Sequence, residues 1–197
     1  MMFDYYNQRS QSFFDQTVDI NMKELYEPFL KLLPPSTHIL DAGCGSGRDT
    51  KAFLELGYTV TAIDAAEAMV ALSSEFTGHQ TLWMSFNEMT FDTCFDGIWA
   101  CASLLHVPSD QIYSVFQRFE KALKPNGIWY LSFKLGSGER WHEGRFFNDF
   151  DEDRFSKVIS AHPVLEIMKV WQTSDRKVDR NHERWLNALV AKRLYDQ

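Results

Sequence analysis

The feature of this sequence that most restricts its fold is a glycine-rich stretch around residue 45. The chain reads Ile-Leu-Asp-Ala-Gly-Cys-Gly-Ser-Gly-Arg-Asp-Thr over residues 39–50, so an apolar run leads into three alternate glycines and then into helix-forming sequence. Glycine carries no Cβ and accepts positive φ, so the backbone at Gly43, Gly45 and Gly47 can approach a ligand closely. A strand, a glycine turn and a helix N-terminus together predict a cofactor-binding corner at the carboxyl edge of a parallel sheet.

The spacing of these glycines separates the corner from two other nucleotide-binding loops. A dinucleotide fingerprint would place its third small residue at position 48, where Arg48 stands. A P-loop requires a lysine directly after its last glycine, and none follows here. A nicotinamide-dependent oxidoreductase is therefore disfavoured. A tight strand-to-helix turn in an unrelated α/β protein is the alternative that the glycines alone leave open.

Strands and helices are predicted to alternate through the first two-thirds of the chain. After an aromatic segment at 3–18, apolar residues at helical spacing predict a helix from Asn21, which Pro28 interrupts or kinks. Strands are then expected from near His38 and at 58–63, 81–84, 96–101 and 128–133, with helices at 48–56, 65–74 and 109–123. This alternation predicts a doubly wound parallel sheet.

The last third of the chain has a different pattern. Residues 134–150 are rich in glycine and aromatic side chains and show no clean period, which predicts a lid and acceptor-selecting loop; a packed surface hairpin is the alternative. A helix is expected at 153–160, followed by strands at 165–172 and 183–191. The short connection between these two strands favours antiparallel pairing.

Composition and charge exclude several classes of protein. The 197 residues, 45% of them hydrophobic, suffice for one domain with its own core. The net charge of −7 disfavours nucleic acid as a partner. Three cysteines without C-x-x-C spacing predict neither a metal site nor a disulfide framework and suit a reducing cytoplasm. No signal-peptide pattern and no apolar run of about eighteen residues occur, so we expect a cytoplasmic protein without a membrane partner.

Together with Asp41, the string Asp-Ala-Gly-Cys-Gly-Ser-Gly resembles motif I of the class I S-adenosylmethionine-dependent methyltransferases. The resemblance implies a Rossmann-like, mostly parallel seven-stranded sheet with an antiparallel last strand, preceded by an N-terminal helical segment. It also implies S-adenosyl-L-methionine as the cofactor. On this basis we expect one methyltransferase domain over residues 1–197. Its expected parts are a helical cap at 1–35, a cofactor-binding core at 36–134, a candidate lid at 134–150 and a C-terminal helix and strand pair at 151–197.

The resemblance also implies which residues surround the cofactor. The expected cofactor-binding residues are Asp41, Gly43, Cys44, Gly45, Gly47, Arg48, Asp64, Ala65, Met69, Ser85, Phe86 and Cys101.

Asp64 and Arg48 are the charged residues with the most defined expected roles. Asp64 ends the second predicted strand about twenty residues after the first glycine, where a carboxylate accepts both ribose hydroxyls; capping of the next helix is the alternative. Arg48 opens a helix, where a cation gains nothing from the helix dipole. Pairing with the methionyl carboxylate of the cofactor is one interpretation of Arg48, and a solvated arginine is the other. Asp41 is expected beneath the turn, accepting hydrogen bonds from loop amides or, through water, from the cofactor's ammonium.

The expected adenine contacts depart from the family pattern. Ser85 stands where many relatives carry an acidic residue, so a hydroxyl, a backbone carbonyl or Asn87 is expected to replace that contact. Phe86 and Met69 are expected to cover the two faces of the ring. The backbone carbonyl of Cys101 is expected to accept from the cofactor's ammonium, whereas Cys44 is expected to be a packing residue.

His106 is the one candidate catalytic residue. The stretch from Cys101 to Pro108 resembles the segment that lines the methyl-transfer cleft of small-molecule methyltransferases. Imidazole titrates near neutral pH, which makes His106 a candidate general base; a structural residue of the lid is the alternative.

These observations predict a methyltransferase that acts on a small-molecule acceptor by in-line methyl transfer. The run from Gly43 to Asp49 is similar to the tellurite-resistance type, which suggests small or soft acceptors. A protein or nucleic-acid methyltransferase and a non-catalytic cofactor-binding module are the alternatives. The Asn/Asp-Pro-Pro-aromatic motif of base-flipping enzymes does not follow the fourth predicted strand. We expect a monomer or a weak homodimer.

Overall fold

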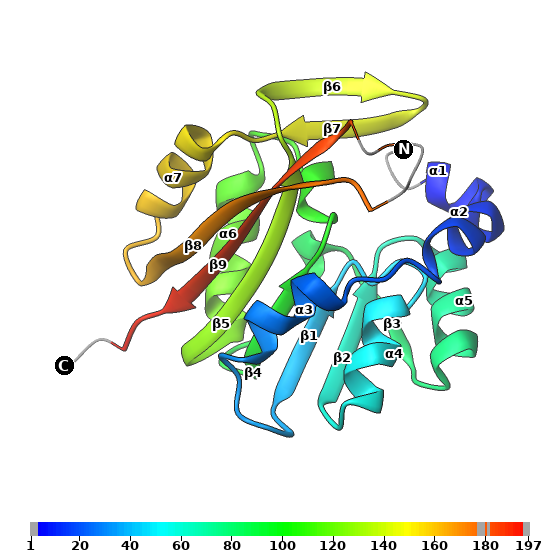
Figure 1. Ribbon diagram of the computed structural model, residues 1–197, viewed down its shortest axis with the longest axis horizontal. Helices are drawn as coiled ribbons and strands as arrows, with labels where there is room; N and C mark the ends of the chain where they lie inside the picture. Colours follow the sequence, from blue (N-terminus) through cyan, green and yellow to red (C-terminus); the bar gives the residue numbers. More distant parts are fainter. Residues whose placement is uncertain (1–3, 177–179, 181, 195–197) are drawn as a thin grey trace.

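The computed structural model describes residues 4–176, 180 and 182–194 of the chain (Figure 1). Residue 3 of the predicted N-terminal segment lies outside the described residues. The strands are β1 (His38–Ala42), β2 (Thr59–Asp64), β3 (Thr81–Trp83), β4 (Phe95–Ala100), β5 (Leu123–Lys134), β6 (Gly138–His142), β7 (Arg145–Asp149), β8 (Leu165–Ser174) and β9 (Arg184–Lys192). The helices are α1 (Asp4–Gln8), α2 (Ser10–Thr17), α3 (Lys23–Leu30), α4 (Arg48–Glu55), α5 (Glu67–Thr77), α6 (Ile112–Ala122) and α7 (Glu152–Ser160), with 3-10 turns η1 (Phe86–Glu88) and η2 (Leu104–His106).

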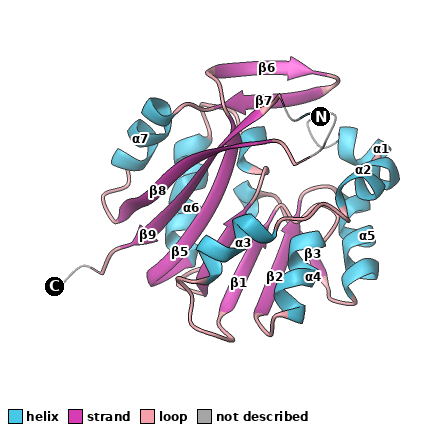
Figure 2. Cartoon of the chain, viewed as in Figure 1, coloured by secondary structure: helices cyan, strands magenta, loops and turns pink. Residues whose placement is uncertain are grey.

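The main sheet has seven strands among the described residues, in the order β3-β2-β1-β4-β5-β9-β8 (Figure 2). Neighbouring strands from β3 to β5 pair in parallel, whereas β9 pairs antiparallel with both β5 and β8. The order of the strands reverses between β1 and β4, and ligands of open α/β sheets bind at the carboxyl edge of such a switch point. The predicted doubly wound sheet with an antiparallel last strand is confirmed.

The core lies on both faces of this sheet, because successive residues of each strand point to opposite faces. On one face Trp129 stacks on Phe119 of α6, with ring centroids 4.9 Å apart. On the other face the next residue, Tyr130, stacks on Trp99 at 3.9 Å, within a cluster that also holds Phe29 of α3. These aromatic layers fix β4 and β5, whose carboxyl ends carry part of the site.

The N-terminal segment forms two helices, α1 and α2, rather than one. Both pack against α5 at the carboxyl edge of the sheet, and the side chain of Asn7 accepts from the backbone N–H of Ala68 at 3.1 Å. The following helix, α3, continues through Pro28. The N-terminal segment therefore lies over the edge where the glycine turn ends β1.

Residues 134–150 form a hairpin of β6 and β7 instead of an irregular loop. The turn residues Glu143 and Gly144 have φ of 49° and 77°, as a tight hairpin turn requires. The inner strand β7 is buried from Phe146 to Asp149, while Trp141 of the outer strand β6 is 67% exposed. In this conformation the segment is a packed hairpin, the alternative considered above, and any opening as a lid stays a prediction.

The other differences from the predicted elements are small. Helix α6 begins at Ile112, three residues later than expected, because residues 109–111 form a turn. Strand β5 begins at Leu123, five residues earlier than expected, and includes Asn126, which has a φ of 60°. Across residues 4–176, 180 and 182–194, no helix has the length and apolarity needed to cross a membrane.

Candidate functional site

Backbone hydrogen bonds hold the glycine turn between β1 and α4 to the neighbouring strand β2. The N–H groups of Gly43 and Cys44 both donate to the carbonyl of Ile63 in β2, at 2.9 and 3.0 Å. A Cβ on Gly43, which has a φ of 78°, would lie 2.5 Å from the Cβ of Ser103. A Cβ on Gly45 would meet only the tip of the Phe13 ring, at 3.3 Å. Both positions have a positive φ, 54° at Gly45, so the backbone favours glycine at each of them. At 43 a side chain would also clash with Ser103, whereas at 45 it would occupy the open space above the turn.

Gly47 and Asp41 contribute to the turn from outside the cavities described below. A Cβ on Gly47 would lie 2.7 Å from the Ser73 hydroxyl, so this glycine allows α4 and α5 to pack closely. Asp41 is 2% exposed and accepts a 2.6 Å hydrogen bond from the hydroxyl of Thr50. Burial and the nearby Asp49 carboxylate raise the pKa of Asp41 to about 8. The expected position of Asp41 beneath the turn is observed, but its partner is a threonine hydroxyl rather than a loop amide.

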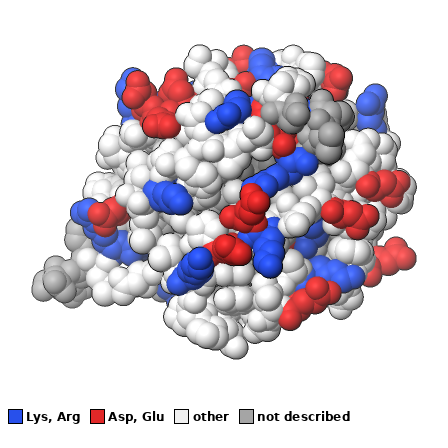
Figure 3. All heavy atoms as spheres, in the orientation of Figure 1, with Lys and Arg blue, Asp and Glu red and all other residues white. Residues whose placement is uncertain are grey.

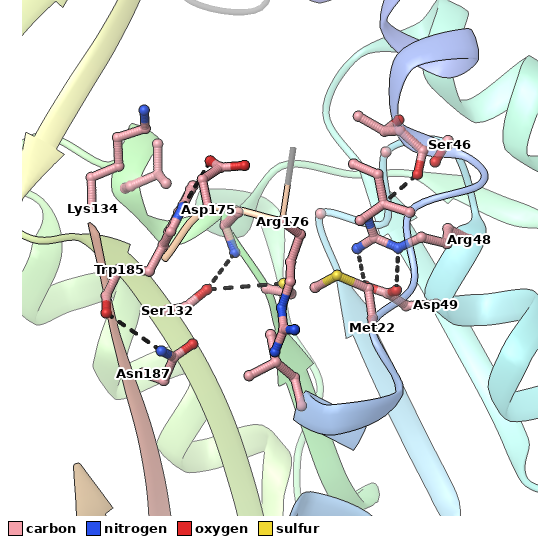
Figure 4. A pocket seen from close by; sticks show the side chains of 18 of the residues that line it. Met22, Ser46, Arg48, Asp49, Ser132, Lys134, Asp175, Arg176, Trp185 and Asn187 are labelled. Carbon is pink, nitrogen blue, oxygen red and sulfur yellow. Dashed lines mark hydrogen bonds and ion pairs between the residues drawn. The ribbon is translucent and has the colours of Figure 1, made fainter. Parts of the chain in front are cut away.

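Two cavities open on either side of the glycine turn. We call the first, of about 380 Å³, the Asp64 pocket; Asp64, Ala65, Met69, Ser85 and Phe86 are among its lining residues. The second, of about 190 Å³, is the Lys134 pocket, which is lined by residues of the glycine turn, β5, β7 and β9 (Figure 4). The residues that line both pockets are Tyr6, Phe13, Gly43, Gly45, Ala102 and His106. The two pockets therefore adjoin each other at the glycine turn.

Asp64 connects the turn to the start of α5. One carboxylate oxygen accepts from the N–H of Gly45 and the other from the N–H of Ala66, each at 2.9 Å. Burial raises the pKa of the Asp64 carboxyl against the effect of these backbone donors. The helix-start contact considered as the alternative is thus present, and the carboxylate also lines the Asp64 pocket.

The guanidinium of Arg48 is engaged within the protein. Its Nε and Nη2 donate to the two carboxylate oxygens of Asp49 at 2.6 and 2.9 Å. Asp49 also accepts from the Tyr26 hydroxyl at 2.5 Å and from the Trp99 indole at 2.8 Å. These donors lower the pKa of Asp49, although burial alone would raise it. Arg48 lines the Lys134 pocket beside Ser46, but its charge is balanced by Asp49, so pairing with a cofactor carboxylate stays a prediction.

The predicted adenine contacts gather in the Asp64 pocket. The hydroxyl and the N–H of Ser85 both donate to Glu88, at 2.7 and 2.8 Å, in a capping box that begins η1. This hydroxyl is therefore already committed as a donor. Phe86 packs edge-on against Phe119, with ring centroids 5.2 Å apart. Met69 lies in the first turn of α5 and is 1% exposed.

The two predicted cysteines of the site lie in the Lys134 pocket. Burial raises the pKa of the Cys101 thiol to about 12 and that of Cys44 well above its usual range. Both are thus uncharged thiols at neutral pH, as expected of packing residues. The residue after Cys101, Ala102, has a φ of 54° and donates its N–H to the Ser132 hydroxyl at 2.9 Å.

His106 has both ring nitrogens in hydrogen bonds. Nδ1 donates to the carbonyl of Phe146 in β7 at 2.7 Å, and Nε2 accepts from the Tyr6 hydroxyl, also at 2.7 Å. Burial, together with the nearby cations Arg145 and Lys134, lowers the pKa of His106 to about 4 against the opposing effect of the Phe146 carbonyl. The ring is therefore neutral near pH 7 and joins α1, η2 and the hairpin. This geometry favours a positioning residue over the predicted general base, which the structure leaves without a free nitrogen.

The buried neutral state of His106 predicts a loss of stability in mild acid. Between pH 6.5 and about 4 the unfolded chain binds a proton at this histidine that the folded chain does not, so the free energy of unfolding falls as pH is lowered. The shift corresponds to at most about 3 kcal/mol. Chemical denaturation at pH 7.5 and 4.5 should show a smaller pH dependence for His106→Asn than for the wild type. An identical pH dependence in both proteins would show that the imidazole is not held neutral.

Sequence reasoning missed most of the Lys134 pocket. Tyr130, Ser132 and Lys134 follow one another at alternate positions of β5 and all line this pocket. That period of two, at the carboxyl end of a predicted parallel strand, was a signal available in the sequence. Arg145 of β7 and Asn187 of β9 gave no such signal, because strand pairing brings them to the site from distant parts of the chain.

Comparisons with known proteins agree with this geometry. Residues 39–127 match a family model described as a methyltransferase domain. The chain is 30% identical over 131 residues to the putative methyltransferase YqeM of Bacillus subtilis, covering 61% of this chain and 52% of the relative. It is 28% identical over 105 residues to a ubiquinone biosynthesis O-methyltransferase of Xanthomonas campestris pv. campestris, covering 50% of this chain and 43% of the relative. The chain thus spans about half the length of these curated relatives.

A solved structure shares the fold over nearly the whole chain. The 1,6-didemethyltoxoflavin-N1-methyltransferase of Burkholderia thailandensis, solved with 1,6-didemethyltoxoflavin and S-adenosylhomocysteine bound, superposes with a TM-score of 0.81 and 23% identity. The superposition covers 98% of this chain and 87% of that one. The family model over residues 39–127, the relatives and this shared fold agree with the resemblance to the class I S-adenosylmethionine-dependent methyltransferases. The cofactor of this class is S-adenosyl-L-methionine.

Proposed function

We propose that this protein transfers the methyl group of S-adenosylmethionine to a small molecule bound in the Lys134 pocket. The observation that carries the proposal is that two cavities adjoin at the glycine turn, with Gly43, Gly45, Ala102 and His106 in the lining of both. A nucleoside in one cavity and an acceptor in the other would place the reacting atoms at this junction. Because the sulfonium is already electrophilic, alignment of the acceptor and exclusion of water are the main requirements.

The proposed binding mode assigns the adenosine to the Asp64 pocket. The Asp64 carboxylate accepts the ribose hydroxyls while it keeps its two backbone contacts, and Phe86 and Met69 cover the faces of the adenine. The backbone at Ser85 and the side chain of Asn87 are the polar groups nearest to the ring edge in this arrangement. The methionyl part crosses the glycine turn toward the carbonyl of Cys101.

The size of the second cavity supports a small acceptor. At about 190 Å³ and bordered by the packed hairpin, the Lys134 pocket suits a compact molecule better than a folded protein surface. Two of the proteins that resemble this chain are named after small molecules. They are the ubiquinone biosynthesis O-methyltransferase and the 1,6-didemethyltoxoflavin-N1-methyltransferase. In this proposal Tyr6 and His106 hold the α1 helix and the hairpin against the junction, which excludes water.

A transfer assay with S-adenosylmethionine labelled in its methyl group tests this proposal. The protein is incubated with the small-molecule fraction of a bacterial extract and, in parallel, with its protein and nucleic-acid fractions. We expect label in the small-molecule fraction, and none when Gly45→Val replaces the wild type, since a branched side chain at 45 fills the cofactor's space. Label confined to the macromolecular fractions, or no label in any fraction, would contradict the proposal.

A further inference from the structure

The Lys134 pocket differs in charge from the rest of the protein. The whole chain has a net charge of −7. The described residues that line this pocket nevertheless include five cations and two carboxylates, namely Arg48, Lys134, Arg145, Arg176 and Arg180 with Asp49 and Asp175. Acidic and basic side chains are mixed over the outer face that Figure 3 shows. The excess of positive charge thus belongs to the cavity and not to a broad basic surface.

Three of these cations form ion pairs with carboxylates of the protein, and these carboxylates differ in how deeply they are buried. Arg48 is fully paired with the buried Asp49, as described above. Lys134 forms an ion pair with Glu183. Arg176 donates from Nη1 to Glu24 at 2.8 Å, but Glu24 is 79% exposed, and such surface pairs contribute little.

Among the described residues, Arg145 has only a distant, exposed carboxylate partner. Its side chain is 11% exposed, and its guanidinium lies 5.1 Å from the ring centre of Tyr5 and 5.2 Å from that of Phe147. The carboxylate nearest to it is that of Glu143, 3.6 Å away and 58% exposed. Within the described part of the chain, no acceptor lies within hydrogen-bond reach of the buried Nε of Arg145, and the same holds for the Nε of Arg176. Buried donors of this kind usually have partners, so a missing acceptor is indicated.

We infer that the acceptor is an anion whose carboxylate or phosphate group binds between Lys134 and Arg145, which both lie against the ring of Phe147. This inference rests on the proposed function and specifies the substrate class of that site. Planar guanidinium groups and an ammonium are the donors that proteins use for such oxyanions. The Lys134 ammonium lies 5.4 Å from the ring centre of Phe147 and 5.5 Å from that of Trp185, so two aromatic rings line the pocket beside this cation. A compact planar anion fits this combination.

The electrostatics of Lys134 agree with a bound anion. Burial lowers its pKa to about 8, with Arg140, Arg180 and Arg145 contributing in the same direction and Asp175 opposing them; Glu183 also faces the ammonium. An anion held beside Lys134 would raise that pKa. Binding should therefore take up a fraction of a proton near pH 8 and weaken as the pH rises above it.

Calorimetric titration of protein saturated with S-adenosylhomocysteine tests the inference. The probes are benzoate and phenyl phosphate, with benzamide and benzyl alcohol as neutral molecules of similar shape. We expect one or both anions to bind at least tenfold more tightly than the neutral probes, with an affinity that falls as salt is added. The stronger of the two anions identifies whether the pocket prefers a carboxylate or a phosphate.

Matched variants connect this binding to the named cations. Arg145→Met keeps the length of the side chain over the two aromatic rings but removes its charge, and it should weaken anion binding at least tenfold while S-adenosylhomocysteine binds within twofold of wild type. Lys157→Met, which removes an exposed cation on α7 remote from the pocket lining, is the control and should change neither affinity. If Arg145→Met does not fold, Lys134→Met is measured in its place.

Three results would overturn the inference. These are equal binding of neutral and anionic probes, no anion binding to the loaded protein, and unchanged anion affinity in Arg145→Met or in the variant that replaces it. Each of them leaves the cofactor assignment intact. Failure of S-adenosylhomocysteine to bind would instead remove the proposed function itself, so the two failures are distinguishable.

Discussion

Asp64→Ala should lower the affinity for S-adenosylhomocysteine by about 3 kcal/mol, which is more than a hundredfold in Kd. Two effects add. The proposed hydrogen bonds from the ribose hydroxyls to a charged acceptor are lost, and the N–H groups of Gly45 and Ala66 lose the carboxylate that now holds them at 2.9 Å. The second effect loosens the glycine turn itself, so stability should fall as well, by about 1–3 kcal/mol. Calorimetry and chemical denaturation measure the two quantities separately.

Asp64→Asn is the matched control for this prediction. The amide keeps the shape and one acceptor oxygen but turns a donor toward one of the two backbone N–H groups, so its affinity and stability should lie between those of the wild type and Asp64→Ala. If Asp64→Ala lost stability but bound S-adenosylhomocysteine as tightly as wild type, Asp64 would support the loop without contacting the ribose.

Asp49→Ala should reduce the free energy of unfolding by about 3–5 kcal/mol, the cost of leaving a buried charge without its partner. Asp49 is 5% exposed, and its two oxygens accept four hydrogen bonds, two of them from Arg48. The substitution leaves the guanidinium unpaired and removes the acceptor for the Tyr26 hydroxyl and the Trp99 indole. In a chain of this length the melting temperature should fall by roughly 10 °C.

The pH dependence provides the check on this second prediction. The pKa of Asp49 is lowered in the folded protein, so its contribution is fully present above the unfolded value of 3.8 and is lost as pH falls toward the folded value. Because burial and the Asp49 carboxylate raise the pKa of Asp41 to about 8, the stability difference between wild type and Asp49→Ala should be compared above pH 8, where Asp41 is ionised in both proteins, and it should shrink in strong acid. A loss below about 1 kcal/mol above pH 8 would show that the network of Arg48 and Asp49 is solvated rather than buried.

The sheet and its cofactor corner were predictable from the sequence because their signals are local. The run from Ile39 to Gly47 combines a strand, a turn and a helix start within a dozen residues, and the structure places them at β1 and α4. The insertion of β9 between β5 and β8, in contrast, has no local signal in the sequence. It was expected from the resemblance to a family and not from periodicity, because pairing between distant strands leaves no local pattern.

The acceptor side of the site was largely unpredictable for the same reason. Arg145 reaches the pocket because the β6–β7 hairpin folds back over η2, and the period of that hairpin is hidden by aromatic residues at consecutive positions. Arg48 shows a second limit. Its position at the glycine turn was expected, but the neighbour that takes up its charge, Asp49, is identified by geometry alone.

Titration of S-adenosylhomocysteine into the wild-type protein, with NAD as the comparison ligand, tests most directly whether the glycine turn binds the expected cofactor. We expect saturable binding of S-adenosylhomocysteine and, at a hundred times its Kd, stabilisation of the fold by about 2.7 kcal/mol in a thermal melt. NAD should leave the melting temperature unchanged, because Arg48 occupies the position of the third small residue of a dinucleotide fingerprint. An unchanged melting temperature with saturating S-adenosylhomocysteine, or a larger shift with NAD, would contradict this assignment.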